Sequence, residues 1–257
     1  METVIMPFIF TLVAGLAMGI GGLLGFVGEG RNKNFFYSSV GFAAGVMLYA
    51  AFVEVLPESF ETLSDIFGEK NGVLYTTIGF FIGIIFMLGT EKFCLTHQHH
   101  DENHIEKEDK AMYRMGIMTA IAIAIHNFPE GLAIFTSALK DTKLGLSVTL
   151  AIIIHNIAVG IAISAPIYYG TGNKKKALGA ALLSGLSEPL GAILGYWILK
   201  DYLNDVIFGI LLSIVAGVMV YISLDELIPS AQKGDSHTGT YSLVFGMFVM
   251  ALTIICI

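Results

Sequence analysis

The sequence predicts an all-α polytopic membrane protein, and both its composition and its apolar patterning support this fold class. Of the 257 residues, 55% are hydrophobic and 14% are charged, and the mean hydropathy is +0.74. A soluble domain carries roughly 25% charged residues. Uncharged apolar runs of about 20 residues, enough to cross a bilayer as a helix, recur along the whole chain. We therefore expect a single transmembrane domain over residues 1–257, embedded in the lipid bilayer.

Eight of these runs are predicted to span the membrane as helices. Their ranges are 5–27, 35–57, 73–93, 112–139, 144–169, 176–199, 205–229 and 240–257. The one long polar segment, 94–110, separates the third helix from the fourth. The other loops are short, so consecutive helices are expected to run antiparallel.

The distribution of Lys and Arg predicts the orientation of these helices. Of the 14 Lys and Arg residues, the loops after the second, fourth and sixth helices hold only Lys70, Lys140, Lys143 and Lys200. Cytoplasmic loops carry the excess of positive charge. We therefore predict a multi-pass protein of the inner or plasma membrane, with both termini outside the cytoplasm and segment 94–110 in the cytosol. No basic face is present, so nucleic acid is not an expected partner.

A repeat within the chain indicates a transporter. Residues 44–58 (AGVMLYAAFVEVLPE) align with residues 216–230 (AGVMVYISLDELIPS) at an offset of 172. The two segments lie in the second and seventh helices, which cross the membrane in opposite directions. Inverted repeats of this kind are typical of secondary transporters. We therefore predict a 3+2+3 arrangement, in which helices 1–3 and 6–8 form two inverted halves and helices 4 and 5 lie between them.

The fourth and fifth helices contain a second pair of related segments, and these carry metal-ligand residue types. IAIHNFPEGLAI (123–134) and IIIHNIAVGIAI (152–163) align histidine with histidine and asparagine with asparagine. His126 and Glu130 are four residues apart, so both project from one face of their helix. Polar side chains at membrane depth are costly and are usually functional. Pro129 frees a backbone carbonyl and is expected to kink the helix beside them.

These residues predict a divalent-metal site near the middle of the membrane. Two imidazoles and a carboxylate, from His126, His155 and Glu130, suit Zn²⁺, and Fe²⁺, Mn²⁺, Co²⁺ and Cd²⁺ are also compatible. Glu188 in the sixth helix would add a second carboxylate, and Asn127 could serve an adjoining position. The alternative is a structural polar cluster that bridges helices by hydrogen bonds, with Glu188 as a packing or proton-relay carboxylate.

Two further groups of residues are candidates for contact with a metal ion as it enters or leaves the transport pathway. The polar segment holds four histidines that suggest loose metal capture on the cytosolic side, namely His97, His99, His100 and His104. His-rich tracts bind metals, although a solvated linker is the alternative. Near the ends of the repeat segments, four acidic residues either line the mouths of a pathway or are interfacial charges: Glu54, Glu58, Asp225 and Glu226.

Three motifs resemble the ZIP family of divalent-metal transporters, and in particular its prokaryotic broad-specificity zinc-uptake branch. They are HNFPEG in the fourth helix, FAAGVMLYAAFVEVLPES in the second and VYISLDELIPSA in the seventh. The resemblance extends over essentially the whole chain. It implies eight helices in a 3+2+3 arrangement, often as a homodimer, and a centre for up to two metals between helices 4 and 5. One site would use His126, Glu130 and His155, the other Asn127, Glu130, Asn156 and Glu188, and both would share a carboxylate from the fifth helix.

The fifth helix departs from this family pattern. The branch resembles HNIPEG at this point, whereas the chain reads HNIAVG, with Ala158 and Val159 in place of the proline and the bridging glutamate. The shared ligand and the helix kink are therefore expected to be absent. A single metal site built on Glu130 is predicted in place of a two-metal centre.

The sequence as a whole predicts a transporter that imports divalent metal, preferably Zn²⁺, into the cytosol. The metal is then the transported substrate, and neither a prosthetic group nor enzymatic activity is expected. One alternative is a transport-impaired metal-binding or sensor protein, which the missing carboxylate favours. The other is an intramembrane zinc metalloenzyme, because two histidines and a glutamate with an open position also form a catalytic arrangement. The chain has no HExxH pair to support the enzyme.

Overall fold

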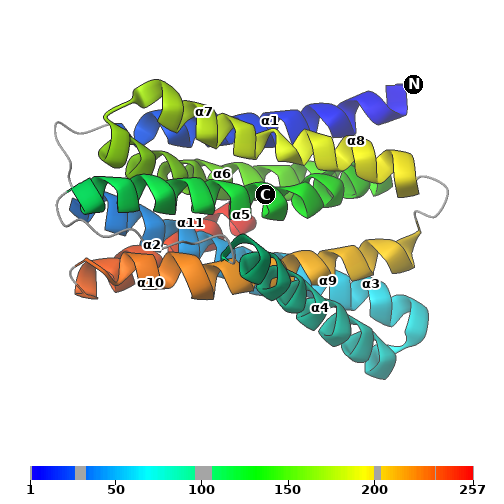
Figure 1. Ribbon diagram of the computed structural model, residues 1–257. Coiled ribbons are helices and arrows are strands. Elements are labelled where there is room, and N and C mark those ends of the chain that lie inside the picture. Colours follow the sequence, from blue (N-terminus) through cyan, green and yellow to red (C-terminus); the bar gives the residue numbers. More distant parts are fainter. Residues whose placement is uncertain (1, 27–32, 96–105, 200–203, 235, 257) are drawn as a thin grey trace.

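The computed structural model describes residues 2–26, 33–95, 106–199, 204–234 and 236–256, which form a bundle of helices (Figure 1). The elements in chain order are α1 (Glu2–Leu24), α2 (Lys33–Ala50), η1 (Ala51–Val55), α3 (Leu56–Phe67), α4 (Glu69–Leu95), α5 (Glu106–Lys140), α6 (Thr142–Thr171), α7 (Lys174–Gly185), α8 (Ser187–Leu199), α9 (Asp205–Ile222), η2 (Ser223–Leu227), α10 (Ile228–Ala231) and α11 (Ser236–Cys256). No strand occurs in the described ranges, and the all-α fold class is confirmed.

The membrane spans agree with the sequence prediction in number but not in every boundary. Seven helical stretches of the described residues are long and apolar enough to cross a membrane, and they correspond to every predicted span except the fourth. The fourth predicted span, 112–139, lies within α5, which is 35 residues long. The second span was predicted to end at 57 but continues through η1 and α3 to Phe67, because Pro57 begins a new helix and the first turn comes at Gly68. The polar segment is shorter than 94–110, and its four histidines lie outside the described residues.

Capping residues make the short turns between the long helices. The first N–H groups of a helix have no partner inside it, and a side-chain acceptor at the N-cap satisfies some of them. Asp141 does this for α6 by accepting two backbone N–H bonds at 2.9 Å, and Asn173 does it for α7 at 3.1 Å. α6 ends at Gly172, whose φ of 64° is easily adopted only by glycine. These tight turns hold α5, α6 and α7 antiparallel, as predicted.

The two repeat segments share a structural irregularity. Ala51–Val55 and Ser223–Leu227 each form a π-helical turn, and their bounds differ by the predicted offset of 172. The turns precede Pro57 and Pro229. Proline lacks an N–H and its ring clashes with the carbonyl four residues earlier, so a widened turn before each proline relieves the clash. π-turns are rare and occur frequently at functional sites. Their matched positions support the internal repeat.

The helices pack as two groups that do not follow chain order. α6 packs mainly against α5 and α1, and α7 and α8 pack against α1 and α5; these helices form the first helix group. α2 packs against α11, and α4 against α9 and α3; with η1, η2 and α10 they form the second helix group. The first and sixth spans lie together in the first group, and the second, third, seventh and eighth spans lie in the second. The two predicted halves are therefore interleaved, and each group contains both copies of its repeated spans.

Glycines bring the helix backbones into contact inside each group. A Cβ added to Gly45 of α2 would meet the carbonyl of Leu243 in α11, and at the repeat-related Gly217 of α9 it would meet the carbonyl of Phe80 in α4. The first group has an equivalent contact between Gly21 of α1 and α6. Every glycine of the described helices whose added Cβ would meet another helix does so within its own group. The closest helix packing therefore lies inside the groups and not between them.

Candidate metal centre

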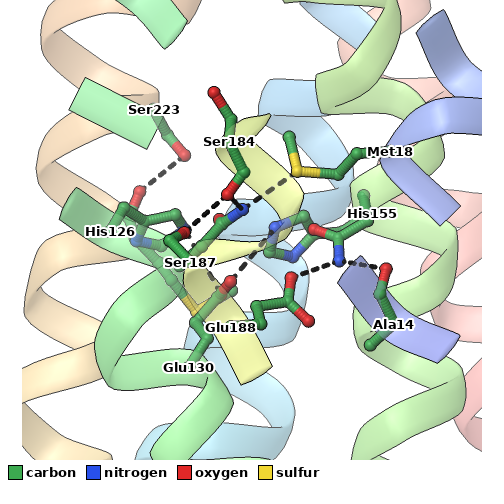
Figure 2. Close-up of polar contacts among 12 residues, drawn as sticks. Ala14, Met18, His126, Glu130, His155, Ser184, Ser187, Glu188 and Ser223 are labelled. Atoms are coloured by element: carbon green, nitrogen blue, oxygen red, sulfur yellow. Dashed lines mark hydrogen bonds and ion pairs between the residues drawn. The ribbon is translucent and has the colours of Figure 1, made fainter. Parts of the chain in front are cut away.

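The polar side chains nominated by the sequence lie together in the first helix group, where α5, α6 and α8 meet α1 (Figure 2). α5 contributes His126, Asn127 and Glu130, α6 contributes His155 and Asn156, and the first turn of α8 contributes Glu188. All six are 0% exposed. Burying so many polar groups is costly unless each one gains a hydrogen bond or an ionic partner.

His126, Glu130 and His155 form a compact triad. Nε2 of His126 lies 3.2 Å from Oε1 of Glu130, and Nε2 of His155 lies 3.7 Å from Oε2. The imidazole rings are stacked, with centroids 5.8 Å apart. One ligand atom of each residue lies within 4.8 Å of the other two. In a tetrahedral Zn²⁺ site with bonds of about 2.0–2.1 Å, the ligand atoms are roughly 3.3 Å from one another. The triad therefore has nearly the dimensions of a zinc site.

Helix geometry places each member of the centre. His126 and Glu130 are one turn apart on α5, which remains a single α-helix through Pro129. On α8, Glu188 follows a break in the helix at Leu186. Pro189 explains this break, since it cannot donate the N–H bond that would continue α7 into α8. The break sets Glu188 in the first turn of a new helix, beside the triad (Figure 2).

The two asparagines are held by their amide nitrogens. Nδ2 of Asn127 donates to the carbonyl of Ser184 at 3.2 Å. Nδ2 of Asn156 donates to the carbonyl of Ala14 at 2.8 Å and to Oε1 of Glu188 at 2.5 Å. Oδ1 of each asparagine has no hydrogen-bond partner among the described residues. Both amide oxygens are therefore fixed acceptors that lack a donor.

Atoms without a hydrogen-bond partner occur on all six residues. Within the described part of the chain, these atoms are both ring nitrogens of His126 and His155, Oδ1 of Asn127 and Asn156, both oxygens of Glu130 and Oε2 of Glu188. Four of them, Nε2 of each histidine and the two oxygens of Glu130, have only the ion-pair contacts within the triad. Native interiors leave few such groups, and each needs an explanation. Imidazole nitrogens and carboxylate and amide oxygens are all cation ligands. A cation would supply the one partner that these atoms have in common.

α1 and α7 also contribute to this centre, and neither contribution was predicted from the sequence. Met18 of α1 is fully buried, and its Sδ lies 2.9 Å from Nδ2 of Asn127. Ser184 of α7 donates from its hydroxyl to the Ala120 carbonyl at 2.7 Å, which positions the backbone that holds Asn127. The available signal was the glycine spacing of α1, because Gly15 meets the backbone of Gly185 and brings α1 against α7.

Val159 and Ala158 pack in the apolar core. Val159 is 0% exposed and Ala158 is 1% exposed, and both belong to the main hydrophobic cluster. Val159 is one turn from His155, on the same face of α6. α6 therefore presents an aliphatic side chain where the family pattern has a carboxylate.

The four acidic residues near the ends of the repeat segments divide into two pairs. Glu54 and Glu58 line a cavity that also reaches Glu130 and His155. Asp225 and Glu226 lie in η2 and do not line this cavity.

Comparison with known proteins identifies the family. The sequence matches the family model for ZIP zinc transporters over residues 3–111 and 95–254. This chain belongs to the ZIP zinc transporter family. It is 48% identical to the zinc transporter ZupT of Clostridium perfringens over 276 residues, which cover 99% of this chain and 97% of that protein. The ZupT zinc transporters of Streptococcus mutans and Chlorobium luteolum are 47% and 49% identical, with 96% of both chains covered in each comparison.

Membership of the ZIP family settles the protein class. ZIP proteins are transporters and not enzymes, so the metalloenzyme alternative is wrong. Zinc is the transported substrate in this family and not a prosthetic group. The helical bundle and its apolar helices agree with a multi-pass membrane transporter.

Proposed function

We propose that this chain imports Zn²⁺ into the cytosol, with Fe²⁺, Mn²⁺, Co²⁺ and Cd²⁺ as further substrates, through a site made by His126, Glu130 and His155. The buried triad carries the proposal, because its ligand atoms lie within 4.8 Å of one another and, apart from the two ion pairs within the triad, have no partner in the described ranges. Asn127, Asn156 and Glu188 would complete or extend the site. Two neutral imidazoles with ionised Glu130 and Glu188 carry a charge of −2, which a divalent cation would neutralise.

The direction of transport is proposed from the Lys and Arg distribution. The cavity above the triad extends as far as Glu61 in the middle of α3 and Leu144 near the start of α6, towards the end of the bundle where α3 ends and α6 begins. That end lies on the lysine-poor side, which the distribution predicts to be outside the cytoplasm. Metal would therefore reach the triad from outside and leave towards the cytosolic segment 94–110, where His97, His99, His100 and His104 would capture it.

The conformational step in this proposal is a sliding of the first helix group against the second. The triad belongs to the first group, while the opposite wall of the cavity comes from η1, α3 and α9 of the second. Backbone contacts at glycines hold each group together internally. A relative movement of the groups would close the outer cavity and open the inner side without separating the ligands from one another.

Val159 favours a second candidate function, a metal-binding or sensor protein that transports poorly. The side chain that would bridge two metals is aliphatic and buried here. The homodimer implied by the family resemblance is also a prediction, which the mass of the purified protein in detergent would test.

Uptake of radioactive zinc into proteoliposomes distinguishes the transporter from the sensor. The proposal predicts saturable uptake that is abolished by Glu130→Ala and retained by Glu69→Gln, which removes an exposed carboxylate far from the triad. Competition by the other divalent metals would rank the substrates. Zinc binding without uptake by the unaltered chain would instead support the sensor.

A further inference from the structure

One face of α1 holds the amide nitrogens of both asparagines of the metal centre. Ala14 and Met18 are four residues apart, so they lie one turn apart on the same face of the helix. The carbonyl of Ala14 accepts from Nδ2 of Asn156 at 2.8 Å. Sδ of Met18 accepts from Nδ2 of Asn127 at 2.9 Å (Figure 2). Any residue at position 14 supplies the first acceptor, whereas the second depends on the side chain at position 18.

Two glycines on neighbouring helices fix the position of Met18. A Cβ added to Gly160 of α6 would meet the carbonyl of Met18, and one added to Gly185 of α7 would lie 3.2 Å from Cβ of Met18. The side chain of Met18 is 0% exposed. Methionine is usually an adaptable residue, because it is unbranched and has three rotatable bonds. Here the close backbone contacts and the burial give its sulfur a definite place against α5.

The sulfur of Met18 completes the hydrogen bonding of the Asn127 amide nitrogen. An amide nitrogen carries two hydrogens, and Nδ2 of Asn127 has two acceptors, Sδ of Met18 and the carbonyl of Ser184 at 3.2 Å. Two fixed acceptors set the orientation of the amide group. They leave Oδ1, which is buried and has no hydrogen-bond partner in the described part of the chain, available to a cation. Without the sulfur, only one of these two contacts would remain.

The oxygen that Met18 orients differs in chemistry from the imidazole ligands beside it. Amide oxygen is a hard ligand that suits Mn²⁺, whereas imidazoles suit borderline metals such as Zn²⁺. Thioether sulfur is a soft ligand, and direct coordination by Met18 would therefore favour the softer Cd²⁺. However, the sulfur already accepts from an N–H group, which favours an indirect role. The two roles change the metal preference in opposite directions, so they can be separated by experiment.

We infer that Met18 is a positioning residue that sets the metal preference of the centre by orienting the Asn127 amide. This inference rests on the proposed function, in which Asn127 completes or extends the triad site. Met18 itself does not touch the cation. It holds a hard oxygen towards the centre and so raises the affinity for Mn²⁺ relative to Cd²⁺.

The test measures the affinities of purified protein for Mn²⁺ alone and for Cd²⁺ alone. M18L removes the sulfur and keeps a buried apolar side chain, and M250L makes the same change at another methionine that is 0% exposed, in α11 of the second helix group. M18L should weaken Mn²⁺ binding about tenfold and Cd²⁺ binding less than about twofold, since losing a partner of a ligand typically costs 10–100-fold in affinity. M250L should bind both metals as the parent does.

The N127A background shows whether Met18 acts through Asn127. In N127A, the further change M18L should leave Mn²⁺ binding unaltered, because the oxygen that Met18 orients is already absent. The visible absorption spectrum of bound Co²⁺ should change in the same way in M18L and in N127A, and it should not change in M250L. A packing role would not produce this shared spectrum.

The outcomes separate this inference from the proposed function. A greater loss for Cd²⁺ than for Mn²⁺ in M18L, equal losses for both metals, or an M18L effect that persists in N127A would overturn the positioning role. Each of these results would leave zinc transport standing. The readouts use purified protein and do not require transport, so the absence of zinc uptake by the unaltered chain would count against the proposed function and not against the role of Met18.

Discussion

Glu130 is the residue that ties the candidate centre together, because its two carboxylate oxygens face different imidazoles at 3.2 and 3.7 Å. The sequence predicted this arrangement in part. The four-residue spacing of His126 and Glu130 placed both on one face of α5, but the approach of His155 depends on how α5 and α6 pack. The ligand-like orientation of Asn127 and Asn156 depends on carbonyl groups of α7 and α1, which no local pattern indicates.

Replacement of Glu130 by glutamine should abolish high-affinity zinc binding. The change keeps the side-chain volume but removes the only negative charge of the triad, so affinity should fall by more than about 100-fold. The metal-free protein should be no less stable, since a buried carboxylate is costly without its cation. Thermal unfolding in detergent, with and without zinc, measures both effects. Glu69→Gln is the control, and zinc-dependent stabilisation that persists in Glu130→Gln would contradict the assignment.

Restoring the family pattern in α6 should change the metal stoichiometry. The double substitution A158P/V159E adds a carboxylate one turn from His155, on the same helix face. We expect the purified protein to bind two zinc ions where the unaltered chain binds one. Elemental analysis after desalting gives the ratio, and A158P/V159Q, which adds the shape without the charge, is the matched control. Equal stoichiometry in all three proteins would show that Val159 does not determine the number of sites.

At the scale of the elements, the repeat was visible in the sequence but its structural meaning was not. The alignment of residues 44–58 with 216–230 correctly indicated related helices. It did not indicate the π-turns, which arise where Pro57 and Pro229 force the preceding turn to widen. Pro57 also led to the prediction that the second span ends at 57. The span continues instead as α3, because proline is tolerated in the first turn of a helix.

Gly21 should be essential for the packing of α1 against α6. A Cβ at this position would meet the carbonyl of Ile157 and lie 3.0 Å from Cα of Gly160. Gly21→Ala should therefore destabilise the protein by about 1–3 kcal/mol, the usual cost of overpacking. Gly179→Ala in α7 meets nothing within 4 Å and should be neutral or stabilising by about 0.5–1 kcal/mol. Thermal midpoints in detergent compare the two, and equal destabilisation would argue against the close contact.

At the scale of the whole molecule, the division into two helix groups could not be predicted from the order of the helices in the chain. Spans 1–3 and 6–8 are related by the repeat, but the contacts join span 1 with spans 4, 5 and 6, and spans 2 and 3 with spans 7 and 8. Long-range packing of this kind depends on which glycines meet, and apolar patterning carries no information about those pairs. The eight spans and the residues of the polar centre were predictable because both follow from local composition and spacing, whereas the contacts that bring those residues together were not.

A crosslink between the two groups should stop transport, whereas a crosslink within one group should not. Nζ of Lys140 at the end of α5 lies 3.4 Å from Oδ1 of Asp205 at the start of α9. This pair therefore connects the first helix group with the second. Phe26 and Tyr168, with ring centroids 5.3 Å apart, both lie within the first group. We expect a short thiol crosslinker to block zinc uptake by K140C/D205C and to spare F26C/Y168C, in chains whose Cys94 and Cys256 are serine.

The single-cysteine variants treated with the same reagent are the controls for the crosslinking. If crosslinked K140C/D205C still transports zinc at the parent rate, the sliding of the groups is wrong, although the metal centre would be unaffected.

The central claim is that His126, Glu130 and His155 hold a divalent cation together, and anomalous scattering at the zinc edge from crystals grown with zinc tests it most directly. We expect an anomalous peak at about 2.0–2.2 Å from Nε2 of both histidines and from a Glu130 oxygen. Zinc-loaded crystals with no peak between these three side chains, or with the metal held only by other residues, would contradict it.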